Sequence, residues 1–301
     1  MSLEVGLASI KLRNPFMNAS GVLGSTASLL RSLAESGAGA VVTKSLSLEP
    51  REGYPTPVLI ELPYGYVNAI GLANPGLDAF AEEMVELEGL GVPIVVSVFG
   101  STVEEFAKAA FKAEELGGSA VELNLSCPHA GGLLHYSQDP KLAYDVVARV
   151  RGSTSIPVLP KLSADSASLI EVARAVERAG ADGVVAINTL RAVCIDVDLR
   201  RPRLSNVFGG LSGPAIKPVA VRCVYELYEE LSVPIVGVGG ISSFQDALEF
   251  ILAGASAVQV GSALAKQGLE LFKRLAAGVQ GYLERHGLAS IKDLIGAAHR
   301  R

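Results

Sequence analysis

Short apolar runs alternate with longer amphipathic stretches from one end of the chain to the other. The apolar runs are rich in Val and Ile and show no polar alternation, which is typical of parallel strands covered on both faces. Helical spacing of apolar positions, as at Val103, Phe106, Ala107 and Ala110, predicts helices between them. The predicted strands are Phe16–Ala19, Ala40–Thr43, Ile94–Val98, Ala120–Leu125, Val158–Lys161, Gly183–Ile187, Ile235–Val238 and Ala257–Val260.

The order of these elements predicts the fold class. Gly-Ala pairs at 37–38, 180–181 and 254–255 stand where a helix should end and a strand begin. Eight strands with helical segments between them predict an α/β fold, a single (β/α)8 TIM barrel over residues 1–301 with extended βα loops. A doubly wound open sheet is the alternative, but the segment 237–242 lacks the third glycine of a dinucleotide fingerprint.

Two segments are too long for plain βα loops. Residues 45–75 contain five prolines, and residues 191–212 follow the sixth predicted strand. Insertions of this length in a compact domain are usually covers or partner surfaces at the barrel mouth, although decorated, inert loops are the alternative.

Composition narrows the function classes. The 301 residues are 49% hydrophobic, enough for a large core, while the net charge of −5 offers no basic face for nucleic acid. No run approaches the roughly 20 apolar residues of a membrane span, and the first residues show no signal-peptide pattern. Three cysteines without a Cys-x-x-Cys pair argue against a disulfide framework, a zinc site or an iron–sulfur cluster, so we expect a reducing cytoplasm.

Reactive side chains stand at the carboxyl ends of the predicted strands, where barrel enzymes carry their active sites. Cys127 follows the fourth strand and precedes a Gly-containing segment, 128–139, that we interpret as a lid; a buried core cysteine is the alternative. Lys44 and Lys161 end the second and fifth strands. A buried ammonium needs an anion, so one anionic cofactor or substrate would satisfy both lysines unless each merely extends to solvent.

Glycines and asparagines at the same rim suggest what binds there. Gly239-Gly240 and Gly261-Ser262 follow the last two strands, where many barrels bind a phosphate through backbone N–H groups. No nicotinamide or metal signature accompanies them, and flavin mononucleotide (FMN) fits the inventory. Three asparagines suggest recognition of a planar molecule, although each alone could be a turn residue: Asn68, Asn124 and Asn188.

The chain resembles the class 1 dihydroorotate dehydrogenases, most closely the class 1B catalytic subunit, over nearly its whole length. The motifs that carry this resemblance are Asn14-Pro15-Phe16-Met17-Asn18-Ala19-Ser20-Gly21, Thr43-Lys44-Ser45, Asn68-Ala69-Ile70-Gly71-Leu72-Ala73-Asn74-Pro75-Gly76, Glu122-Leu123-Asn124-Leu125-Ser126-Cys127-Pro128, Lys161-Leu162-Ser163, Ile187-Asn188-Thr189-Leu190, Gly209-Gly210-Leu211-Ser212-Gly213-Pro214-Ala215-Ile216-Lys217-Pro218 and Gly237-Val238-Gly239-Gly240.

The resemblance implies FMN-dependent oxidation of dihydroorotate to orotate, with Cys127 as general base and Lys44 and Lys161 beside the flavin. It implies substrate contacts at Lys44, Asn68, Gly71, Leu72, Asn124, His129, Asn188 and Thr189. It implies cofactor contacts at Ala19, Ser20, Gly21, Lys44, Ser45, Ser97, Asn124, Lys161, Ile187, Ser212, Gly213, Gly239, Gly240, Gly261 and Ser262.

Two positions depart from the family pattern. His129 stands where relatives usually have Asn, and an imidazole cannot copy both faces of an amide. Ser97 stands where relatives often carry Asn near the flavin.

The resemblance also implies partners: an FAD and iron–sulfur subunit that passes electrons to NAD, and a homodimeric core. The arginines at 200, 201 and 203 make the 191–212 insertion a candidate contact, with a solvated loop as the alternative. Other readings are a dihydropyrimidine dehydrogenase-like reductase, a tRNA-dihydrouridine synthase, which would need a basic face, and a non-catalytic scaffold barrel.

Overall fold

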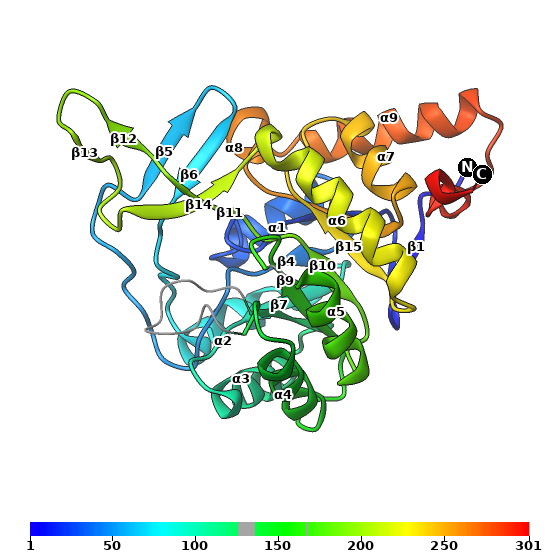
Figure 1. The fold of residues 1–301 in the computed structure, drawn as a ribbon. Helices are drawn as coiled ribbons and strands as arrows, with labels where there is room; N and C mark the ends of the chain where they lie inside the picture. Colours follow the sequence, from blue (N-terminus) through cyan, green and yellow to red (C-terminus); the bar gives the residue numbers. More distant parts are fainter. Residues whose placement is uncertain (126–135, 167, 301) are drawn as a thin grey trace.

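The computed structural model describes residues 1–125, 136–166 and 168–300. Its main sheet has eight parallel strands in the order β3-β16-β15-β10-β9-β8-β7-β4. A parallel bridge from Met17 to Ala40 joins the two outer strands, so the sheet closes into a barrel and the predicted TIM barrel is confirmed (Figure 1). The strands are β3 (Phe16–Asn18), β4 (Val41–Val42), β7 (Ile94–Val98), β8 (Ala120–Asn124), β9 (Val158–Leu162), β10 (Val184–Ala186), β15 (Ile235–Val238) and β16 (Ala255–Val260), and each overlaps one predicted strand.

Helices follow the barrel strands and cover the barrel from outside (Figure 1). Local signals set their ends: Ser243 and Asp246 form a capping box at one start, and Gly180, at φ +96°, follows the end of another helix. Within the described ranges, no helix has the length and apolar character to cross a membrane. The main helices are α1 (Ala27–Glu35), α2 (Leu77–Glu86), α3 (Val103–Glu115), α4 (Pro140–Arg151), α5 (Leu169–Arg178), α6 (Lys217–Glu230), α7 (Phe244–Leu252), α8 (Ala263–Gln267) and α9 (Leu271–Arg285).

The two long insertions pair with each other. They supply β5 (Leu59–Leu62), β6 (Gly65–Asn68), β11 (Leu190–Val193) and β14 (Phe208–Ser212), which form a four-stranded antiparallel sheet in the order β11-β14-β6-β5. A short pair, β12 (Ile195–Asp196) and β13 (Arg201–Pro202), extends from it. Figure 1 shows this second sheet projecting from one side of the barrel. The sequence indicated insertions here but not these strands, because the pairing joins segments more than a hundred residues apart.

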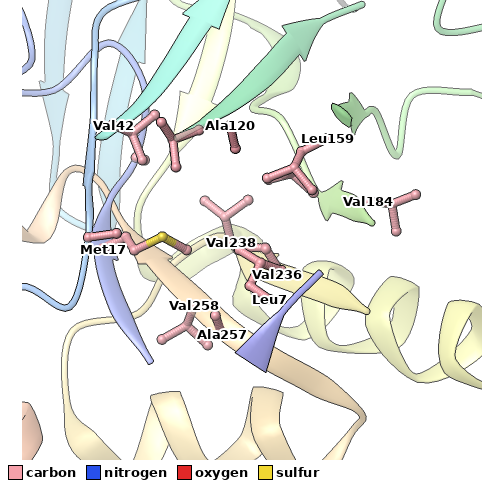
Figure 2. Close-up of a cluster of buried hydrophobic side chains, with 14 of the residues drawn as sticks. Leu7, Met17, Val42, Ala120, Leu159, Val184, Val236, Val238, Ala257 and Val258 are labelled. Atoms are coloured by element: carbon pink, nitrogen blue, oxygen red, sulfur yellow. The ribbon is translucent and has the colours of Figure 1, made fainter. Parts of the chain in front are cut away.

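The barrel interior is apolar over most of its length. An unpredicted N-terminal hairpin, β1 (Val5–Leu7) and β2 (Ile10–Leu12), brings Leu7 to the apolar cluster beside Val236 (Figure 2). The same cluster contains Ala120, Leu159 and Ala257, which come from three different barrel strands. This apolar layer is the floor of the barrel interior, and the polar residues lie next to it, towards the carboxyl ends of the strands.

Candidate active site

A polar layer lies next to this apolar floor. Side chains alternate along a strand, so residues two positions apart share a face. On β8, β9 and β16, the residues two positions after Ala120, Leu159 and Ala257 are Glu122, Lys161 and Gln259, respectively. All three are at most 3% exposed. The sequence therefore places a carboxylate, an ammonium and an amide together inside the barrel, towards the carboxyl ends of its strands.

Lys161 is held by three side chains. Its Nζ donates to Ser20 Oγ at 3.1 Å, to Gln259 Oε1 at 3.2 Å and to Glu122 Oε1 at 3.4 Å. Gln259 Nε2 donates in turn to Glu122 Oε2 at 2.6 Å. The inference that Lys161 needs an external anion was wrong, because Glu122 supplies one from within the chain.

A line of hydrogen bonds continues from Glu122 across the barrel mouth. Ser97 Oγ donates to Glu122 at 3.5 Å, and Ser97 and Ser45 share a bond of 2.9 Å between their hydroxyls. Asn124 Nδ2 donates to Ser45 Oγ at 3.2 Å, and Asn188 Nδ2 donates to Asn124 Oδ1 at 3.3 Å. Residues expected at the substrate are thus connected to those expected at the flavin.

Lys44 lies just after β4 in a different setting. Burial lowers the pKa of its ammonium below the ordinary value of 10.5, because desolvation penalises the charged form. Desolvation is the sole cause of this shift, and no residue within the described ranges gives the Lys44 side chain a hydrogen bond or ion pair. An anionic ligand beside Lys44 would remove that penalty.

The end of β6 and the segment that follows it contain three predicted substrate positions. Asn68 Nδ2 donates to Gly210 O at 3.3 Å, which ties the two insertions together at this point. Gly71 and Leu72 both have positive φ, +76° and +58°, so the backbone turns sharply here. Arg51 Nε donates to Gly71 O at 2.8 Å and fixes the turn.

Thr189 lies just before β11 and is packed against Gly210 of β14. Its backbone N–H donates to Asn188 Oδ1 at 2.8 Å, which orients that amide. A Cβ on Gly210 would lie 2.1 Å from Thr189 Oγ1. Only glycine therefore allows Thr189 to occupy its place.

The glycines predicted to hold a phosphate follow β15 and β16, which are neighbouring strands of the barrel, and we call this part of the rim the glycine cradle. Gly240, at φ +78°, has no room for a side chain, since a Cβ would lie 2.7 Å from Gly213 O. The backbone N–H groups of Gly240, Gly261 and Ser262 have no acceptor among the described residues. Other predicted cofactor positions border the same strand ends or the neighbouring insertion: Ala19, Gly21, Ile187, Ser212 and Gly239. This arrangement suits an anionic group.

Cys127 and His129 lie outside the described residues, as does the expected lid up to residue 135. The described end of that range is anchored: the Tyr136 ring meets Phe106 edge-on at 5.7 Å, and Asp139 caps α4.

Sequence reasoning missed several polar residues of the site. Glu122, Gln259, Asn18, Asn74 and Arg51 were given no role, yet the first three are at most 2% exposed. A charged or amide side chain inside an otherwise apolar strand is a readable signal, because such groups are seldom fully buried unless they are paired. The contact of Arg51 with Gly71 joins distant residues and leaves no such signal. Asn74 bonds to Ser47 but also locally to Leu72 O and Gly76 N, as a turn residue before Pro75-Gly76 does.

A closed eight-stranded barrel with a buried cation and convergent amides at the carboxyl ends of its strands belongs to the class of (β/α)8 enzymes. The family model for dihydroorotate dehydrogenase matches residues 2–283. The chain therefore belongs to the dihydroorotate dehydrogenase family.

Individual relatives are similar over the full length. A Pyrococcus furiosus protein named dihydroorotate dehydrogenase B (NAD(+)), catalytic subunit, is 50% identical over 301 residues, covering 100% of both chains. Proteins of the same name from Pyrococcus abyssi and Methanothermobacter thermautotrophicus are 50% and 47% identical, covering 98% and 99% of this chain and 99% and 98% of their own.

Proposed function

We propose that this chain oxidises dihydroorotate to orotate in pyrimidine (UMP) biosynthesis, as the catalytic subunit of a class 1B dihydroorotate dehydrogenase. Similarity to relatives of that name over the whole chain supports the proposal. The structural observation that carries it is the line of hydrogen bonds from Asn188 to Lys161, because it joins a set of amides to a buried cation.

Family membership implies a flavin, and we take it to be FMN, whose single phosphate suits the glycine cradle. Gly213, Gly240, Gly261 and Ser262 would hold the phosphate through backbone N–H groups. Lys161 and Ser20 would face the ring system, where a cation stabilises negative charge. When bound, FMN supplies the acceptor for the hydride that leaves C6 of the substrate.

The chain's own residues would bind the substrate and move the proton. Asn68, Asn124 and Asn188 offer amide donors and acceptors to a planar ring, and Lys44 offers a cation to an anionic ligand. Cys127 would take the proton from C5. A free thiol titrates near pH 8.5, so the rate should rise with pH as the thiolate fraction grows.

Anaerobic mixing of the purified protein with dihydroorotate tests this function. Bleaching of the flavin absorbance is expected, and chromatography of the released cofactor should give FMN. Cys127→Ala should keep the flavin but reduce it about 10²–10⁴-fold more slowly. A flavin-free protein, or one bleached by dihydrouracil but not by dihydroorotate, would reject the assignment.

We also propose a separate FAD and iron–sulfur subunit that carries electrons to NAD, a homodimeric core and a cytoplasmic location. The relatives' name, catalytic subunit, supports a second subunit. The proposed contact is the tip of the 191–212 insertion, where Ile195, Val197 and Leu199 are 54%, 80% and 59% exposed beside three arginines. The chain alone should reduce artificial dyes but form NADH only when the partner is added; efficient NADH formation without it would refute the partner.

A further inference from the structure

Glu122 is a fully buried carboxylate to which the reaction outlined above assigns no role. Both of its oxygens are engaged: Oε1 accepts from Lys161 and Ser97, and Oε2 accepts from Gln259. Glu122 has no solvent exposure, and its side chain lies within the barrel rather than at a helix surface. The group is therefore part of the interior of the site.

Stability alone is a weak explanation for this pair. Taking an ammonium and a carboxylate out of water costs several kcal/mol per ion, and apolar replacements of a buried pair are often neutral or stabilising. The adjacent layer of the same barrel is filled by Ala120, Leu159 and Ala257 without any charge (Figure 2). An apolar Glu122–Lys161 position would thus be compatible with the fold.

The hydrogen bonds of Lys161 show which groups hold its ammonium and which side of it faces the expected flavin. Two of the three N–H groups of Lys161 are taken by Glu122 and Gln259, and the third goes to Ser20, beside the positions expected to contact the flavin. An ionised carboxylate only accepts hydrogen bonds, so Glu122 turns the donor end of the Gln259 amide towards itself. The Gln259 carbonyl oxygen is then left to accept from Lys161.

We propose that Glu122 and Gln259 are positioning residues that hold Lys161 at the flavin and that the Glu122 charge sets the flavin's reduction potential. This inference rests on the proposed function only in that the group facing Lys161 is a flavin. The Lys161 ammonium favours the electron-rich reduced form, and the Glu122 carboxylate offsets that effect. The balance of the two charges determines how readily the bound flavin accepts electrons and passes them on.

The sign of each substitution follows from this balance. Glu122→Gln removes the offsetting negative charge, so the potential should become more positive. Lys161→Gln removes the cation, so the potential should become more negative. We expect at least a tenfold change in the equilibrium constant for two-electron reduction in each case, which is about 30 mV. The double variant Glu122→Gln/Lys161→Gln should lie between the single variants, near the wild-type value.

The test is a reductive titration of the flavin-loaded proteins against a reference dye under anaerobic conditions, with flavin affinity and melting temperature measured in parallel. Glu270→Gln is the matched control, since Glu270 pairs with Lys273 on the exposed surface of the protein at 2.9 Å. Its potential should equal that of the wild type. If Glu122 had only a structural role, Glu122→Gln would change the melting temperature and leave the flavin's reduction potential unchanged.

The inference can still be tested if Glu122→Gln fails to fold. That variant leaves an uncompensated buried ammonium, whereas the double variant leaves no buried charge. Adding Glu122→Gln to Lys161→Gln should still raise the potential by the same tenfold criterion. An unchanged potential in that comparison overturns the inference, while a wild-type protein that binds flavin and is bleached by dihydroorotate leaves the proposed function intact.

Discussion

Asn18 closes the barrel with its side chain, and its replacement tests how the site is supported. Val41 N donates to Pro93 O, just before β7, and Thr43 N donates to Val95 O within it, so the N–H and C=O of Val42 face the other way, towards β3. Asn18 Oδ1 accepts from Val42 N at 2.8 Å, and Asn18 Nδ2 donates to Val42 O at 2.7 Å and to Val22 O at 3.0 Å. One amide thus extends the short backbone pairing between β3 and β4, which is otherwise a single bridge from Met17 to Ala40.

The expected loss follows from these contacts. Asn18→Ala leaves two polar groups of Val42 without partners, and both Asn18 and Val42 are fully buried. Each unpaired buried group costs about 1–3 kcal/mol, and the vacated space adds about 1 kcal/mol. We expect a total loss of about 3–7 kcal/mol, which for a chain of this size is a fall in melting temperature of roughly 5–11 °C.

Thermal unfolding at a fixed flavin occupancy measures this effect, because a bound ligand raises the melting temperature by itself. Asn206→Ala is the matched control: Asn206 also donates its amide to a backbone carbonyl, Phe208 O at 3.1 Å, but on the surface. That variant should change stability by no more than about 0.5 kcal/mol. A melting temperature for Asn18→Ala within about 2 °C of the wild type would show that water or a shift of β3 replaces the amide, and would refute the reasoning.

Four further outcomes are expected. Lys44→Met should increase the free energy of unfolding of the ligand-free protein by about 1 kcal/mol, and so raise its melting temperature, while it weakens orotate binding. A calorimetric titration that finds unchanged affinity for orotate would contradict this. Orotate affinity of the wild type should fall as pH rises through the Lys44 pKa, which burial lowers below 10.5, because only the ammonium attracts the anion. Gly210→Ala should raise KM at least tenfold by displacing Thr189, with little change in flavin content. Val197→Asp should lower partner-dependent NADH formation but not dye reduction, and equal losses in both assays would exclude a contact role.

The fold was predictable because its signals are local. Each barrel strand contains a short, mainly apolar run such as Ile94–Val98, and helix ends follow from glycines such as Gly180. The strands of the second sheet were not predictable in the same way. The pairing of Gly210 with Asn68 depends on two insertions meeting in space, and nothing in either segment alone specifies that partner.

The candidate site was predictable in its types of residue but not in its connections. Strand ends pointed to Lys161 and Asn124, since polar groups there are unusual in a buried strand. Their partners could not be read, because Gln259 lies 98 residues from Lys161 and comes within 3.2 Å only through the barrel closure. Alternation along β8 would have placed Glu122 on the same face as Asn124, so this carboxylate, like Gln259 and Asn18, left a local signal that was missed.

The two lysines of the site differ in one physical respect that has a consequence for function. Lys161 has a fixed counter-charge in Glu122, so its position and charge do not depend on a ligand. Lys44 has no such partner within the described ranges, and burial disfavours its charged form. Ligand binding beside Lys44 therefore gains from relieving a desolvation penalty that is already present in the fold, whereas binding beside Lys161 meets a cation that the barrel has already stabilised. A permanently held cation suits a resident cofactor, and a cation that needs its anion suits a substrate that comes and goes.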